Sequence, residues 1–194
     1  MMVTPTFDVS ASRRVSAQRA IHGNGECLRY RLDVVAGSAV DVVHSAGGWL
    51  YDRVMAGWEV TVLLPGSCDT RPLRILGVAV VDTESEFVPT AMGSTSHTLA
   101  VSAEAFSADA RLRDKVLESL GDRLTEVALW GDGWPLGVNR GMTRAQHVLS
   151  AAARKFKGYA LAAAGIPSAL VEPTETLLCE ASYPRVDSEL VRLD

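Results

Sequence analysis

The residues best suited to bind a ligand lie in one stretch of the chain: Asp132, Trp134, Asn139, Arg140 and Arg144. An aspartate can act as a general base, a tryptophan can stack on a flat ligand, and an arginine can hold a phosphate or carboxylate through two parallel hydrogen bonds. Both arginines lie beside the expected start of a helix at Thr143, where free backbone N–H groups attract anions. The sequence therefore predicts an anion-binding site in this stretch.

The charge pattern favours the same stretch, because residues 134–171 contain no Asp or Glu. Lys155 and Lys157 belong to this basic segment but lie too far along the expected helix to share the site. The alternative interpretation is a solvated basic face that pairs with the acidic residues at 84–86 or with a partner. Asp132, between two glycines, could instead be a metal ligand or simply a turn residue, and we favour the turn, because aspartate is common in turns.

Other candidate groups follow the expected strands. Ligands of an open α/β sheet bind beyond the carboxyl ends of its strands, and residues 65–71, with Cys68, and Asp82 occupy such positions. Cys68 could be a nucleophile, but no paired base is visible, and a small buried thiol is the commoner role. The sequence predicts no metal site, because its histidines are isolated from one another: His22, His44, His97 and His147.

Motifs that identify several large enzyme classes are absent. The sequence has no Walker A loop, no complete dinucleotide-binding glycine fingerprint, no GxSxG, no HExxH and no EF-hand loop. It therefore names no cofactor and no family.

A pattern of helix, glycine and strand occurs three times, with the helices ending at Gly57, Gly121 and Gly165. Glycine suits the left-handed residue that ends many helices. The clearest copy begins with a capping Ser38 and leads to the continuous apolar run at 60–64, which is typical of a strand covered on both faces. Its helix has Asp41 in the first turn, where an acidic side chain suits the positive helix start, and Arg53 outside its buried stripe. The repetition predicts a single three-layer α/β domain with a mostly parallel sheet flanked by helices.

Other patterns predict the remaining elements. Residues 27–35 alternate between apolar and polar side chains, which predicts a strand with one buried face. Residues 72–81 form an apolar run interrupted by Gly77, which indicates a bulged strand or two short pieces. The further elements expected are strands at 97–103, 124–130 and 168–171, and helices at 107–120 and 143–164. In the last helix, Tyr159 belongs to the apolar stripe along one side.

Gly47 and Gly48 interrupt the first expected helix, where each glycine costs roughly 1 kcal/mol relative to alanine. One explanation is the close approach of a ligand or partner to the backbone. The other, which we favour, is close packing of the helix on the sheet or a local kink.

Composition and charge limit the class of protein. The chain has 194 residues, of which 47% are hydrophobic, and its net charge is −4. These values argue against a disordered chain and against a free-standing basic nucleic-acid binder. Three cysteines without a CxxC pair favour a cytoplasmic protein, and no apolar run is long enough to cross a membrane. We expect a basic, weakly structured segment at 1–25, the α/β domain at 26–171 and a tail at 172–194.

Three functional hypotheses follow. The missing motifs and uneven charge favour a non-catalytic accessory or regulatory protein that acts through a protein partner or self-association. The alternative is an enzyme or sensor that binds a small anionic metabolite, phosphorylated or nucleotide-like, at the carboxyl ends of the strands. The third is a nucleic-acid-associated role through the arginines at 13–19 and the basic residues at 154–157, which the net charge disfavours.

Overall fold

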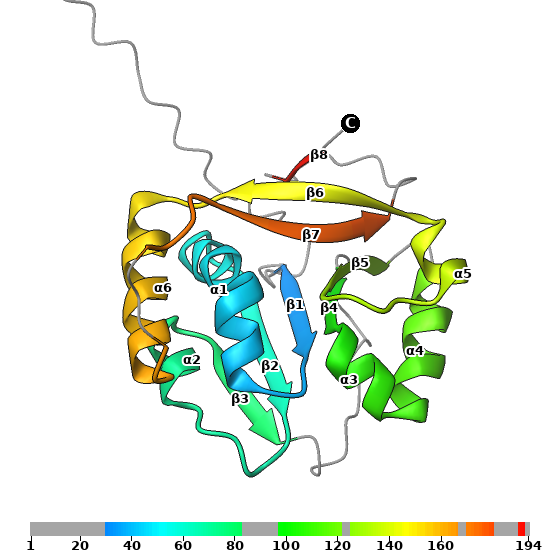
Figure 1. Ribbon diagram of the computed structural model, residues 1–194, viewed down its shortest axis with the longest axis horizontal. Helices are drawn as coiled ribbons and strands as arrows, with labels where there is room; N and C mark the ends of the chain where they lie inside the picture. Colours follow the sequence, from blue (N-terminus) through cyan, green and yellow to red (C-terminus); the bar gives the residue numbers. More distant parts are fainter. Residues whose placement is uncertain (1–29, 83–96, 122–124, 167–169, 181–189, 193–194) are drawn as a thin grey trace, which may run out of the picture.

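The computed structural model describes residues 30–82, 97–121, 125–166, 170–180 and 190–192, which form one eight-stranded sheet with helices on both faces (Figure 1). The strands are β1 (Arg31–Val35), β2 (Glu59–Leu64), β3 (Ala79–Asp82), β4 (His97–Ser102), β5 (Thr125–Trp130), β6 (Met142–Val148), β7 (Thr174–Glu180) and β8 (Leu190–Arg192). The helices are α1 (Ala39–Met55), α2 (Arg71–Ile75), α3 (Ala103–Ala108), α4 (Ala110–Gly121), α5 (Leu136–Asn139) and α6 (Ala151–Ala163).

The strand order is β3-β2-β1-β4-β5-β7-β6-β8. The first five strands in this order are parallel, whereas β7 runs antiparallel to both β5 and β6, and β8 runs antiparallel to β6. The predicted mostly parallel sheet is therefore confirmed.

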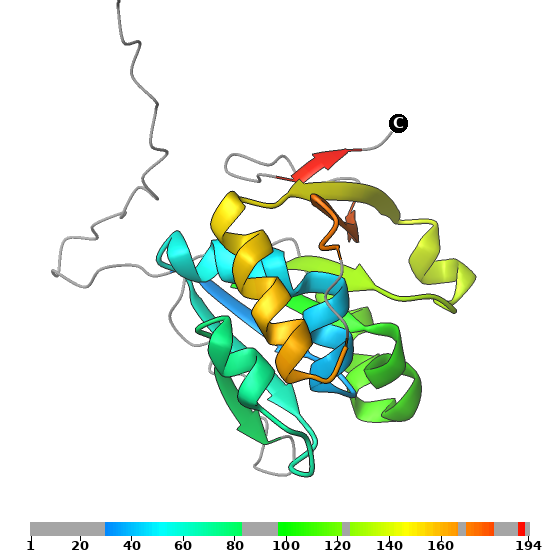
Figure 2. The ribbon, with the colours of Figure 1, turned by 60° about the vertical axis from the view of Figure 1, so that its left-hand side comes forward.

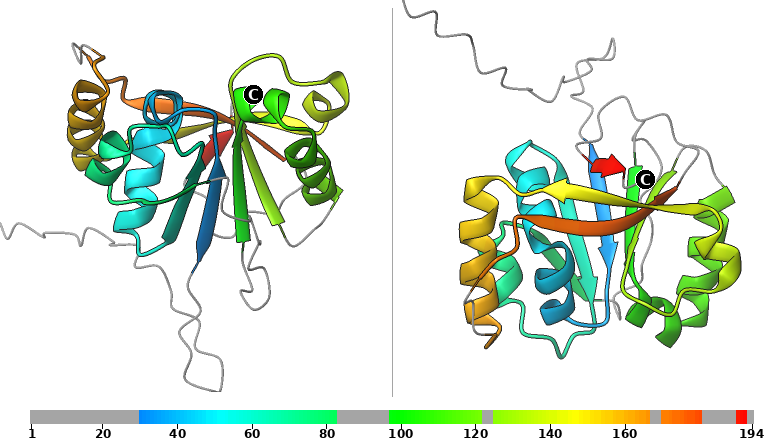
Figure 3. Two further views of the ribbon diagram at one scale, coloured as in Figure 1. Left: turned by 90° about the horizontal axis from the view of Figure 1, so that it is seen from below. Right: turned by 45° about the horizontal axis from the view of Figure 1, so that its top comes forward.

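Two hydrophobic cores lie on opposite faces of the sheet, which confirms the three layers. One core joins the sheet to α1, α2 and α6, and the other joins it to α3, α4 and α5 (Figure 3). Figure 2 shows α6 packed against α1 on the first face. Apolar residues on both faces of the central strands account for this double covering.

The first helix and the strand after it form as predicted. The Ser38 hydroxyl accepts a hydrogen bond from the Asp41 N–H at 3.2 Å and caps α1, and Gly57 has a φ of 90° just beyond the helix. β2 is parallel to both of its neighbours, β1 and β3. Capping residues and apolar runs were sufficient to predict this helix and this strand, because each signal lies within the element that it defines.

Two predictions about buried faces are wrong. β1 is buried on both faces, because it lies between β2 and β4, and Asp33 is only 2% exposed with its carboxylate 3.0 Å from Arg31 Nε. Arg53, expected outside the buried stripe of α1, is also buried, with its guanidinium 4.6 Å from the Trp58 ring centroid. Stacking on an aromatic ring accommodates its charge.

The run at 72–81 is not one bulged strand. Its first part forms α2, which has Pro72 in its first turn, and its second part enters β3 after Gly77, whose φ is 77°. α3 was not predicted, and it begins where the Ser102 hydroxyl accepts the Ala105 N–H. Gly121 is the last residue of α4 and lacks the expected left-handed conformation.

The long helix predicted from Thr143 is also wrong at its start. Residues Met142–Val148 form β6, and α6 begins only after Ser150, whose hydroxyl accepts the Ala153 N–H at 3.0 Å. The buried residues of α6 differ from the predicted stripe, which included Tyr159: they are Ala153, Lys157, Ala160 and Leu161. Tertiary pairing of β6 with β7 and β8 overrides the helical pattern.

The segment after 172, expected as a tail, contributes β7 to the interior of the sheet. Gly165, with a φ of 76°, ends α6 as predicted, but the strand that follows is the antiparallel β7, and Leu170 and Val171 lie outside any strand. The basic segment at 1–25 and the loop at 83–96 lie outside the described residues. None of the helices within the described ranges has the length and apolarity that a bilayer crossing requires.

Candidate functional site

The candidate site lies where β5 and β7 separate. The paired register between these strands consists of Ala128 with Cys179 and Leu129 with Leu178. Trp130 and the loop after it continue beyond this register, at the carboxyl end of β5. A cavity of about 690 Å³ opens here, with walls formed by β5, the loop to α5, β6 and β7. A crevice beside the carboxyl end of a strand is where open α/β sheets bind ligands.

Four of the five predicted site residues line this cavity, which we call the polar cavity: Asp132, Trp134, Asn139 and Arg144. Arg140 does not line it, because it is the exposed residue that ends the short helix α5. The side chains of Asp132, Asn139 and Arg144 belong to exposed residues, so a ligand would reach them from solvent. The cavity therefore combines one carboxylate, one amide and one guanidinium with apolar walls.

Backbone geometry explains how the loop presents these groups. Gly131 and Gly133 have φ values of 87° and 89°, which side chains rarely tolerate, and they place Asp132 between two sharp changes of direction. The one-turn helix α5 then returns the chain to β6, which supplies Arg144. The helix start that we expected beside Arg144 is consequently wrong, because Arg144 lies on the strand β6, and the anion site itself stays a prediction.

Trp134 forms a wall of the polar cavity. Its residue is only 6% exposed, and its ring packs against Phe106 of α3 with centroids 4.8 Å apart. Its indole N–H is buried and has no hydrogen-bond partner among the described residues. An unpaired buried donor is costly, and the structure retains it at the wall of this cavity.

The cavity wall contains a second tryptophan, Trp130, whose orientation depends on α1. Its indole N–H donates to the Asp41 carboxylate at 2.8 Å, and the other oxygen of Asp41 accepts the Ser45 hydroxyl at 3.0 Å. The sequence assigned Asp41 only to the first turn of α1. Its link to the end of β5 could not be predicted, because the two residues are far apart in the chain.

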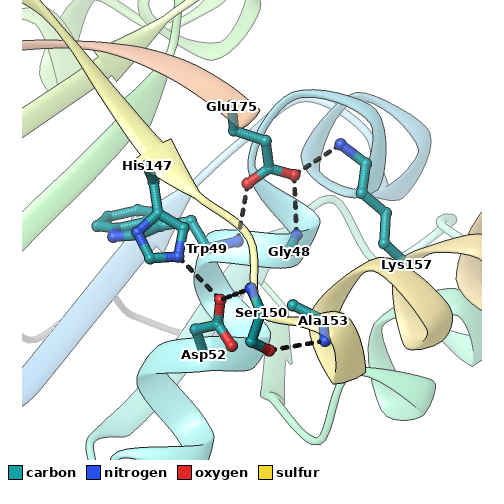
Figure 4. Close-up of polar contacts among 8 residues, drawn as sticks. All are labelled: Gly48, Trp49, Asp52, His147, Ser150, Ala153, Lys157 and Glu175. Atoms are coloured by element: carbon teal, nitrogen blue, oxygen red, sulfur yellow. Dashed lines mark hydrogen bonds and ion pairs between the residues drawn. The ribbon is translucent and has the colours of Figure 1, made fainter. Parts of the chain in front are cut away.

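A second cavity, of about 410 Å³, lies between α1, α6 and the start of β7. It contains a buried ion pair in which Lys157 Nζ lies 2.6 Å from Glu175 Oε1 (Figure 4). The same ammonium donates to the carbonyl oxygen of His44, also at 2.6 Å. The sequence analysis placed Lys157 outside the site and did not identify Glu175.

Glu175 also binds the backbone of α1 directly. The N–H groups of Gly48 and Trp49 donate to its two carboxylate oxygens at 2.8 and 2.7 Å (Figure 4). The His44 carbonyl, to which the Gly48 N–H donates in a regular helix, accepts a hydrogen bond from Lys157 Nζ here. Figures 1 and 3 show the two halves of α1 running in different directions. The glycine pair thus marks a kink, as we favoured.

A third polar cluster joins β6 to the second half of α1. His147 Nε2 lies 2.9 Å from Asp52 Oδ2, which also accepts the Ser150 N–H at 3.1 Å (Figure 4). Burial raises the pKa of Asp52, but the hydrogen bonds from His147 and Ser150 together outweigh burial, so the pKa lies below its ordinary value. The cluster fixes the junction between β6 and α6 and lines neither cavity described above.

The other predicted positions lie elsewhere on the sheet. Cys68 and Asp82 line a separate cavity of about 410 Å³ at the ends of β2 and β3, away from β5. Within the described residues, no three His, Cys, Asp or Glu side chains lie together in a way that could hold a metal ion.

The chain resembles solved structures in its fold, whereas no known protein resembles it closely in sequence among those compared. No family model matches the chain, and no curated protein sequence matches it. A crystal structure of the A40926 pseudoaglycone deacetylase is 14% identical, with a TM-score of 0.55, and the match covers 81% of this chain and 99% of that protein. A deacetylase of the teicoplanin biosynthesis pathway is 13% identical, with a TM-score of 0.51 and coverages of 84% and 99%.

Both of these similar structures are enzymes. This finding contradicts our interpretation of the chain as a non-catalytic accessory or regulatory protein, and it favours the alternative, an enzyme or sensor that binds a small anionic metabolite. At 13–14% identity, the property that this chain shares with them is the fold.

Proposed function

We propose that the protein is an enzyme that binds a small, polar, negatively charged molecule in the polar cavity and removes an acyl group from it by hydrolysis. The observation that carries this proposal is the cavity of about 690 Å³ at the end of β5, which collects Asp132, Asn139 and Arg144. The reaction class is taken from the two deacetylases of similar fold. The negative charge of the ligand is inferred from Arg144.

Each polar residue has a role in this proposal. Arg144 binds the anionic group, because a guanidinium recognises carboxylate and phosphate oxygens. Asn139 exchanges hydrogen bonds with ligand hydroxyl groups. Asp132 accepts a proton from the attacking water; the water oxygen bonds to the acyl carbon, the carbon–nitrogen bond breaks, and the proton passes to the departing amine.

The test is a binding and product assay on matched variants. N-acetylated amines that carry a phosphate or carboxylate are titrated into the protein by calorimetry, and released acetate is measured. Losing a charged hydrogen bond costs about 1.5–3 kcal/mol, so Arg144→Ala should weaken binding by roughly tenfold to a hundredfold. Arg154→Ala, an exposed arginine on α6, is the control and should leave binding unchanged.

Asp132→Asn distinguishes binding from chemistry. It should retain binding within about threefold and lose most acetate release, because an amide cannot act as the base. Absence of binding by every charged compound, or equal losses in Arg144→Ala and Arg154→Ala, would reject the proposed function.

A further inference from the structure

We infer that the substrate has two parts, and that its acyl group is a flexible aliphatic chain bound in the second cavity, between α1, α6 and β7. The inference rests on the proposed function, since it assigns the polar part of the same substrate to the polar cavity. We call the second cavity the acyl cavity.

The two cavities meet at the split between β5 and β7. Trp130, Gly131 and Thr176 line both of them. Trp130 and Gly131 belong to the end of β5, and Thr176 belongs to β7, so the shared wall spans the separation of the strands. Gly131 has no side chain at this point, and Trp130 is held by Asp41. A single elongated molecule can therefore occupy both cavities.

The far end of the acyl cavity is apolar. Four aliphatic residues line it: Leu161, Ile166, Leu170 and Val171. Leu170 is 81% exposed, which leaves a large apolar side chain in water unless something covers it. An aliphatic chain against these residues would remove apolar surface from water, which is the main source of affinity for such groups.

The charged residues of the acyl cavity do not require a charged ligand. Lys157 and Glu175 are 6% and 4% exposed and neutralise each other at 2.6 Å. The other carboxylate in the lining, Glu172, is an exposed residue, so water solvates its charge without a ligand. An ammonium has three N–H donors, and the contacts of Lys157 to Glu175 and to the His44 carbonyl use two of them. The third can donate to the carbonyl oxygen of an acyl group. This arrangement fits a neutral amide followed by a hydrocarbon chain.

The experiment measures binding against acyl-chain length. The probes are N-acyl derivatives of glucosamine 6-phosphate, with chains from acetyl to decanoyl, titrated into the full-length protein by calorimetry. Burying one methylene is expected to tighten binding about threefold to fourfold. Affinity should rise with chain length until the cavity is filled.

Two variants reduce the acyl cavity: Ile166→Trp and Thr174→Trp, each at a partly exposed lining residue. Val81→Trp, which lines the separate cavity at the end of β3, is the matched control. In the first two variants, the acetyl probe should still bind and the gain with chain length should disappear. In the control variant the gain should persist. Thermal unfolding establishes that each variant is folded.

The outcomes separate the two proposals. If acetyl binding depends on Arg144 but longer chains bind no tighter, the inference is wrong and the proposed function stands. If longer chains bind more tightly in Ile166→Trp and Thr174→Trp as well, the chain lies elsewhere and the inference is again wrong. If no probe binds to the unaltered protein, both the inference and the proposed function fail.

Discussion

Lys157 illustrates how strongly the role of one residue depends on its partners. In the sequence it is one of several cations on an expected helix, and in the structure it is buried on Glu175 and on the His44 carbonyl. Burying a charge is expensive unless a partner and hydrogen bonds compensate for it. Removing one partner should therefore lower the free energy of unfolding by more than the intact pair contributes to it.

We predict that Lys157→Met lowers the free energy of unfolding by about 3–5 kcal/mol, because Glu175 would keep a buried charge without its cation. Glu175→Ala should be at least as damaging, since it also removes the acceptor of the Gly48 and Trp49 N–H groups. Urea denaturation measures both changes.

The matched control for Lys157→Met is Lys155→Met, two residues away on the exposed side of α6. That substitution should change the free energy of unfolding by no more than about 0.5 kcal/mol. Equal effects of the two lysine substitutions would show that the buried pair does not form.

Asp52 makes stability depend on acid pH. A carboxyl group whose pKa is lowered by folding stabilises the protein above its ordinary value of 3.8, and this contribution is lost as the pH falls through the lower folded value. We predict that Asp52→Asn destabilises the protein near pH 6, and that the difference from the unaltered protein shrinks below about pH 4. Denaturant midpoints measured across this range check the prediction.

Asp69 provides the control for this experiment, because Arg71 also lowers its pKa but both side chains are exposed. Asp69→Asn should have a small effect that high salt removes, since exposed ion pairs are screened. A salt-sensitive effect of Asp52→Asn, with no dependence on pH below 4, would contradict the assignment of Asp52.

At the scale of the element, Gly48 lies in close contact with a neighbouring side chain at the kink in α1. A Cβ atom at Gly48 would lie 2.5 and 2.6 Å from the two methyl carbons of Leu149, which is buried. A Cβ at the neighbouring Gly47 would lie 3.3 Å from one Leu76 methyl. The two glycines thus share a helix and differ in the space around them.

We predict that Gly48→Ala destabilises the protein by about 1–3 kcal/mol, the usual cost of overpacking a core. Gly47→Ala should be much milder, because its gain in helix propensity, about 1 kcal/mol, offsets a tighter contact. Leu149→Ala should reduce the penalty of Gly48→Ala in a double-mutant cycle. Equal penalties at the two glycines would contradict the contact with Leu149.

At the scale of the whole molecule, β7 connects the two halves of the sheet. It lies between β5 and β6, pairs with both, and supplies Glu175 and the wall shared by the two cavities. A strand with a partner on each side cannot be removed without exposing the backbone and the apolar faces of both neighbours.

We predict that a chain ending at residue 172 loses cooperative unfolding, whereas a chain ending at residue 180 retains it. The second truncation keeps β7 and removes β8, which pairs only with β6 among the described strands. Thermal unfolding of the two truncated chains, monitored by circular dichroism, tests this prediction. A cooperative transition in the shorter chain would show that β7 is dispensable.

Sequence patterns were sufficient to predict those elements whose capping residues and apolar spacing lie within the element itself. The cap at Ser38, the left-handed Gly57 and the apolar run of β2 predicted the first part of the fold, because hydrogen bonds along a helix and burial along a strand leave regular spacings. The cluster of ligand-binding residue types also identified four lining residues of the polar cavity before its shape was known.

Only the tertiary structure decided that Arg144 lies on a strand, that β7 enters the sheet, and that Lys157 meets Glu175. Residues 142–148 continue the helical pattern of the segment after them, and they form a strand because they pair with β7, which follows α6 in the chain. A buried ion pair leaves no periodic pattern, because its free energy depends on a partner from a distant segment.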